Sequence, residues 1–137
     1  KNYLSTISAM ILIGCNTKSN EIEYGTFELY ENDSIVGTIY RIHNYQIEKY
    51  LDKTELIARI QYQSDSTYLI NGIEETQIGV DSISWLTTYR KIEENRYRIN
   101  AIPSNVSIDY QYDAILLKIN KTVPENYKSL LDSLNLE

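Results

Sequence analysis

The chain has 137 residues, of which 42% are hydrophobic and 23% charged, which suffices for one domain with a single core and disfavours a second domain. Its formal net charge of -6 disfavours nucleic-acid binding, because most of the surface would repel a phosphate backbone. One cysteine excludes an internal disulfide, and one histidine excludes a metal site built on several imidazoles. We therefore expect no metal and no cofactor.

The first fifteen residues have the pattern of an export signal. An apolar run over residues 7–13 ends at Gly14, and Cys15 follows before the composition turns polar. The run is too short to cross a bilayer, which takes about 20 apolar residues, but it fits the hydrophobic part of a secretory signal. We expect residues 1–14 to be a signal peptide and residues 15–23 to carry the modified cysteine and a flexible polar tether.

The four residues 12–15, Leu-Ile-Gly-Cys, resemble the lipobox of bacterial lipoproteins. In that family the cysteine receives a diacylglycerol, the leader is cleaved before it, and the new amino terminus is acylated. The resemblance implies that Cys15 is lipidated and that the membrane is a partner; two or three acyl chains attach a protein almost permanently, at about 0.8 kcal/mol per buried methylene. Because Asn16 is not the Asp that retains such proteins in the inner membrane, the outer membrane is the favoured location within the cell envelope.

Residues 24–121 have the pattern of strands throughout. Tyrosine, with 13 copies, and β-branched residues suit a pleated, half-buried surface. The clearest alternation places Leu56, Ala58, Ile60 and Tyr62 on one face. Residues 71–80 are expected to form a longer loop. Turn residues separate eight predicted strands over residues 24–30, 34–42, 45–50, 56–63, 67–70, 83–89, 97–101 and 106–119.

Two further features complete the predicted fold. The last strand changes from alternating to nearly continuous apolar residues, which predicts a bulge or bend near Asp113. After it, Thr122 and Glu125 have capping-box spacing around Pro124, which predicts a short helix that packs on one end of the sheet. One helical face carries Tyr127, Leu130, Leu131 and Leu134.

We therefore predict a single, mainly β domain over residues 24–137. Eight short strands joined mostly by short turns favour an antiparallel meander that forms a small barrel or a curved open sheet. A two-sheet sandwich is the alternative.

Catalytic chemistry has little support in the sequence. His43 lies beside Asn44 in a predicted turn, and no Gly-x-Ser-x-Gly elbow accompanies it. Adjacent carboxylates such as Glu74 and Glu75 would point to opposite faces of a strand, which leaves Asp109 and Asp113, four residues apart, as the best acid–base pair. We assign no catalytic residue and do not favour an enzyme.

The aromatic residues have two interpretations. Tyrosines on strands commonly stabilise a sheet through cross-strand pairs. Some could instead line a concave pocket, because a phenol combines an apolar face with a hydrogen-bonding tip. The candidate pocket aromatics are Tyr45, Tyr62, Trp85, Tyr110 and Tyr112.

Three blocks in the body resemble a group of small uncharacterised lipoproteins from Bacteroidota. They are residues 25–27, Arg41 with residues 45–48, and residues 64–68. Around the third block those proteins often carry a Trp and a Cys, where this chain has Tyr62 and Ser66. The resemblance covers about residues 24–70 and implies an envelope lipoprotein with a compact β domain.

Two hypotheses about function follow. The first is a non-catalytic, lipid-anchored module that binds an envelope protein or a small ligand. The alternative is a carrier of a small apolar molecule in a barrel pocket, similar to lipocalins in architecture. A closed barrel with a sizeable apolar cavity would favour the carrier, and a filled core would favour the interaction module; two carboxylates about 5–10 Å apart in a cleft would favour a hydrolase.

Overall fold

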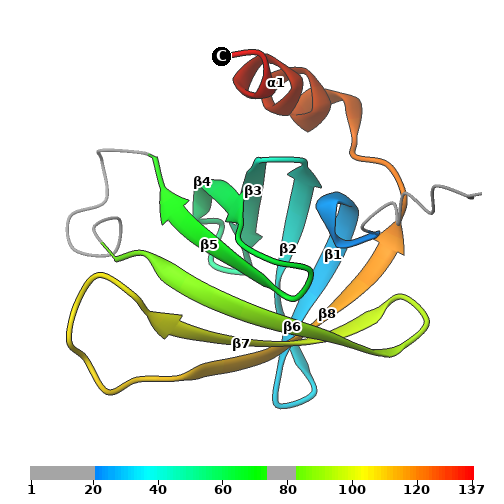
Figure 1. Ribbon diagram of the computed structural model, residues 1–137. Helices are drawn as coiled ribbons and strands as arrows, with labels where there is room; N and C mark the ends of the chain where they lie inside the picture. The colour runs from blue at the N-terminus through cyan, green and yellow to red at the C-terminus, as the bar shows by residue number, and fades with distance from the viewer. Residues whose placement is uncertain (1–20, 74–82) are drawn as a thin grey trace, which may run out of the picture.

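A computed structural model describes residues 21–73 and 83–137. Its strands form a closed antiparallel barrel in which each strand pairs with the next along the chain and the last pairs with the first (Figure 1). The prediction of an eight-stranded meander with a C-terminal helix is confirmed, and the meander closes into a barrel. The elements are η1 (Glu21–Glu23), β1 (Tyr24–Glu31), β2 (Ser34–Ile42), β3 (Tyr45–Tyr50), β4 (Glu55–Tyr62), β5 (Thr67–Gly72), β6 (Trp85–Glu93), β7 (Arg96–Pro103), β8 (Tyr112–Asn120) and α1 (Glu125–Asn135).

Alternating residues of the strands point into the barrel and form its core. Ala58 and Ile60 on β4 are 2% and 1% exposed, so the apolar face predicted for this strand points inward. The residues that pack around them come from all parts of the chain and include Phe27, Leu29, Ile39, Tyr68, Ile99 and Leu116.

The short 3-10 helix η1 closes one end of the barrel. Ile22 is fully buried in the core, and its backbone oxygen accepts a hydrogen bond of 3.0 Å from Arg41 Nη1. The carboxylate of Glu21 accepts a hydrogen bond from the Tyr97 hydroxyl, and its backbone oxygen accepts one from Lys118 Nζ. Residues 21–23 therefore pack against the barrel, just before the boundary expected at residue 24. A single buried isoleucine among acidic neighbours has no periodicity by which to recognise it.

The helix α1 lies outside the barrel, against β2 and β3 (Figure 1). Leu131 is fully buried there with Ile42, Ile47 and Val123. The predicted capping box is wrong: Pro124 is the N-cap residue, and no side chain caps the helix. Neither helix in the described ranges is long and apolar enough to span a bilayer.

The last strand is shorter than predicted. It begins at Tyr112 rather than at Val106, because its neighbour β7 ends at Pro103 and the pair Ala101–Tyr112 is the last rung of their ladder. The register irregularity on β8 falls at Ile119, between the partners of Thr26 and Phe27, and not near Asp113.

Candidate ligand-binding cavity

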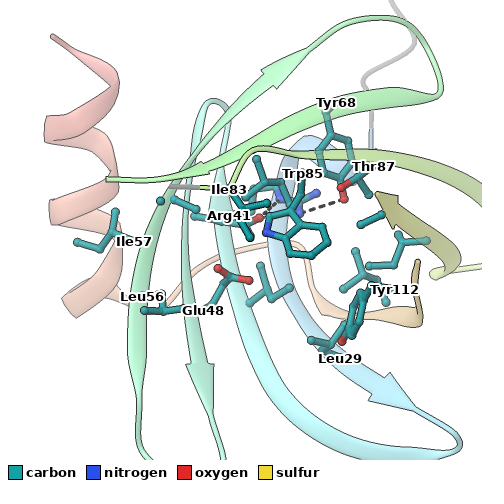
Figure 2. Close-up of a pocket in the computed structure, with 18 of the residues that line it drawn as sticks. Leu29, Arg41, Glu48, Leu56, Ile57, Tyr68, Ile83, Trp85, Thr87 and Tyr112 are labelled. Carbon is teal, nitrogen blue, oxygen red and sulfur yellow. Dashed lines mark hydrogen bonds between the residues drawn. The ribbon is translucent and has the colours of Figure 1, made fainter. Parts of the chain in front are cut away.

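A cavity of about 250 Å³ lies inside the barrel (Figure 2). Its wall includes Tyr50 at the end of β3 and Tyr112 at the start of β8, so it reaches the end of the barrel opposite η1. Because a cavity of about 150 Å³ holds benzene, one of this size accommodates on the order of ten non-hydrogen atoms. The apolar part of the wall includes Leu29, Ile39, Ala58, Ile70, Ile99 and Leu116.

Arg41 lies at the inner end of this cavity and is 1% exposed. Its Nε and Nη2 atoms both donate to Gln46 Oε1, at 2.9 and 2.6 Å. Nη2 also donates to the Tyr68 hydroxyl at 3.5 Å. The guanidinium carbon lies 5.0 Å from the centre of the Tyr68 ring and 5.5 Å from that of Phe27, at cation–π distance. Burial lowers the pKa of Arg41, but Tyr68, Tyr62 and Glu48 together raise it by more, so the side chain stays charged.

The buried charge of Arg41 has no ion-pair partner in the described parts of the chain. No carboxylate oxygen there lies within 4.0 Å of the guanidinium. Glu48 provides a carboxylate in the cavity wall, and it accepts a hydrogen bond of 3.0 Å from the Tyr50 hydroxyl. Burial raises the pKa of Glu48, and the contacts with Tyr50, Arg41 and Gln46 oppose that rise only in part. Burial therefore makes the Glu48 carboxyl easier to protonate than a solvated one, even beside the charge of Arg41.

Two fully buried polar atoms in the cavity wall make no hydrogen bond: Gln46 Nε2 and Thr87 Oγ1. The orientation of the Gln46 amide follows from chemistry, because a guanidinium has only donors and must face the oxygen. The Gln46 amide group lowers the pKa of Glu48 but does not reach that carboxylate at hydrogen-bonding geometry. An unpaired buried polar atom costs about 1–3 kcal/mol, so a molecule that bonds to these atoms would be stabilised by the site.

Aromatic side chains surround the outer part of the cavity. Trp85 and Tyr110 pack edge to face, with ring centroids 5.9 Å apart, and Tyr110 is half exposed. The Tyr50 hydroxyl donates to Glu48 and that of Tyr112 donates to Glu31. Burial raises the pKa of both phenols, so both remain hydrogen-bond donors.

The five candidate pocket aromatics fall in three places. Trp85, Tyr110 and Tyr112 line the cavity. Tyr62 packs against the core away from the cavity, and its hydroxyl donates to the backbone oxygen of His43. Tyr45 lies on the outer side of β3, in the cluster beneath α1. Their different positions follow from strand alternation and from the level of each residue along the barrel axis.

Sequence reasoning did not single out Arg41, Gln46, Glu48 or Thr87 as site residues. The pairing of β3 with β4 could have indicated them, because Gln46 lies opposite Ala58, which belongs to the clearest apolar face in the chain. Residues directly opposite each other in a ladder point to the same side of the sheet, so Gln46 must point inward with Ala58.

The remaining candidates lie away from the cavity or outside the described residues. His43 occupies the β2–β3 turn with a φ of 51°, and its ring contacts Tyr24. Asp113 accepts a hydrogen bond from Asn100, whereas Asp109 is exposed in the β7–β8 connection. Cys15 and the pair at residues 74–75 lie outside the described residues.

Comparison with known proteins adds one structural likeness. No protein-family model matches the chain, and no curated protein matches it either. The fold is similar to the crystal structure of a DUF4909 family protein from Staphylococcus aureus subsp. aureus Mu50, at 15% identity and a TM-score of 0.45. The match covers 70% of this chain and 95% of the other. In the described ranges, the chain's own strand pairing and side chains define a small β-barrel with an interior cavity.

Proposed function

We propose that the barrel is a binding protein for a small, mostly apolar ligand that occupies the interior cavity. The observation that carries this proposal is the cavity itself. It has a volume of about 250 Å³, a largely apolar wall and an aromatic mouth formed by Trp85, Tyr110 and Tyr112. A barrel whose side chains filled its interior completely would instead favour recognition through the outer surface. The volume suits a compact molecule and is below the usual range for ligands of drug size.

Binding is favoured over catalysis by the composition of the cavity wall. In the described ranges, the wall contains no serine, cysteine or histidine. The hydroxyl of Thr87 has no hydrogen-bond partner and so no adjacent base to activate it as a nucleophile. The carboxylate of Glu48 is held by a tyrosine hydroxyl. These features support reversible binding without a chemical step.

The cavity can be tested with ethylbenzene, a small neutral probe. Trp85 is the single tryptophan of the chain and lines the cavity, so its fluorescence reports occupancy directly. We expect a saturable fluorescence change in the wild-type protein and its loss in Ala101→Phe, because Ala101 lies in the wall and the added ring fills the space. The neighbouring Ile102→Phe is the control, because Ile102 is 38% exposed and lies outside the wall.

Two measurements guard this test against misinterpretation. Circular dichroism melts establish that both variants are folded, and Ala58→Leu fills the wall from a different strand if Ala101→Phe does not fold. A non-saturable signal, or one that survives both cavity-filling changes in folded protein, would contradict binding in the barrel.

We further propose that the protein is held at the cell envelope by lipid on Cys15. The support is the lipobox-like sequence and the apolar run before it. In cells that export the full-length protein, Cys15→Ala is expected to move it from the membrane to the soluble fraction and to abolish incorporation of labelled palmitate. Ser19→Ala, in the same polar segment, is the control. Membrane fractionation with continued label uptake in Cys15→Ala would refute the anchor.

A further inference from the structure

The polar end of the cavity indicates what the ligand carries there. Gln46 Nε2 and Thr87 Oγ1 are each on residues with 0% exposure, both residues line the cavity, and neither atom has a partner. Nε2 brings two N–H groups and is a donor only, while the Thr87 hydroxyl can donate one hydrogen bond. A ligand oxygen that accepts a hydrogen bond would satisfy either atom.

Arg41 adds a positive charge behind these donors. Its two hydrogen bonds to Gln46 Oε1 polarise the amide, which strengthens the N–H groups on the other side of the same amide. Figure 2 shows Arg41, Tyr68 and Thr87 converging on one part of the barrel interior from different strands. The guanidinium has no carboxylate within ion-pair distance in the described parts of the chain. An anionic oxygen would therefore meet hydrogen-bond donors and also balance an enclosed cation.

The surroundings of Glu48 favour an anionic ligand over a cationic one. An amine could approach its carboxylate, but that carboxylate is already engaged by the Tyr50 hydroxyl. The amine would also lie near the Arg41 charge, and its N–H groups would face the donors of Gln46. Burial also raises the pKa of Glu48, so its negative charge is less favoured than that of a solvated carboxylate.

We propose that the ligand is a small monocarboxylate, whose carboxylate accepts hydrogen bonds from Gln46 Nε2 and Thr87 Oγ1 and is balanced by the Arg41 guanidinium. This inference rests on the proposed function, since it assigns the ligand class of the same cavity. The apolar body of the ligand extends toward Trp85 and Tyr112 at the aromatic mouth. A cavity of about 250 Å³ limits the enclosed part to on the order of ten non-hydrogen atoms, as in octanoate.

The test compares three probes of nearly equal shape: octanoate, octanamide and octylamine, with Trp85 fluorescence and calorimetry as readouts. We expect octanoate to bind at least tenfold more tightly than octanamide, because both offer an acceptor but only octanoate carries the charge. Octylamine is expected not to saturate. Ethylbenzene serves as the neutral probe that reports the cavity without the polar subsite.

Two variants test the assigned residues. Gln46→Glu keeps an oxygen toward Arg41 but replaces the donor with a second oxygen, so octanoate affinity should fall at least tenfold while ethylbenzene affinity is unchanged. Thr87→Val keeps the side-chain shape and removes an unpaired hydroxyl, so the protein stays folded and octanoate affinity falls roughly fivefold. Thr88→Val, the exposed neighbour on β6, is the matched control.

The outcomes separate this inference from the proposed function. Equal affinity for octanamide, tighter binding of octylamine, or octanoate binding unaffected by both variants overturns the carboxylate subsite, while saturable ethylbenzene binding leaves the cavity assignment standing. If none of the probes binds, both proposals fall.

Discussion

Replacing Ile22 by alanine tests how strongly the 3-10 helix η1 is held by the barrel. Ile22 is fully buried among core residues such as Phe27 and Tyr68. Truncating a fully buried isoleucine to alanine costs about 2–5 kcal/mol, from lost burial and from the cavity that remains. That is a large part of the roughly 5–15 kcal/mol by which a typical domain is stable. The backbone oxygen that accepts from Arg41 is unchanged, so the experiment isolates the side chain.

The assay is urea denaturation of the full-length chain, followed by circular dichroism and by Trp85 fluorescence. We expect the free energy of unfolding to fall by at least 2 kcal/mol. For a domain of this size that corresponds to a decrease in Tm of roughly 10 °C. The matched control is Ile119→Ala, because Ile119 is 50% exposed and the same atoms are removed from a largely solvated position.

The reasoning would be refuted by a small effect. A residue of a flexible tether changes stability by less than about 0.5 kcal/mol when truncated. If Ile22→Ala and Ile119→Ala were equally stable, residues 21–23 would not be an integral part of the domain, and the boundary suggested by the sequence would stand.

Three further predictions concern protonation and backbone geometry. Burial raises the pKa of Glu48, so the native state binds more protons than the unfolded chain above about pH 4.5, and the free energy of unfolding should fall as pH rises through the folded pKa. In urea titrations at several pH values, Glu48→Gln should lack this fall. Parallel pH profiles of wild type and variant would contradict the prediction. The hydrogen bond from Lys91 lowers the pKa of Glu21, so the pH dependence of stability has the opposite sign and the free energy of unfolding falls as pH drops below about 4.5. Glu21→Gln should reduce that loss in the same titrations. Gly25→Ala should lower the free energy of unfolding by about 1–3 kcal/mol in urea, because φ is 124° there and a Cβ atom would lie 2.5 Å from the Asn120 backbone oxygen; a change under 0.5 kcal/mol would show that the backbone relaxes.

The strand order could be predicted because turn residues and period-2 alternation are local signals. Alternation on β4 also identified the correct inward face, since Ala58 and Ile60 are apolar opposite the polar Arg59 and Gln61. Closure into a barrel rather than a sandwich depends on the pairing of β8 with β1. These strands lie about 90 residues apart in the sequence, so no local pattern predicts their pairing.

The polar part of the cavity could not be predicted from β3 alone. Its alternation separates Tyr45 and Ile47 from Gln46 and Glu48, but a period of two does not indicate which set faces inward. The apolar set faces outward here because α1 covers it, and the polar set lines the cavity. The inward orientation of Gln46 and Glu48 therefore depends on the docking of α1, which lies about 80 residues later in the chain.

The position of α1 has a consequence for how this protein can vary. Gln46 and Glu48 line the cavity, so under the proposed function their substitution alters ligand preference, whereas substitutions at Tyr45 and Ile47 alter how α1 packs on the barrel. Inserting one residue in β3 would exchange the two sets and damage both at once. If the cavity binds a ligand as proposed, related chains should vary at every second position of this strand while the intervening positions stay apolar, a pattern that an alignment of homologues would reveal.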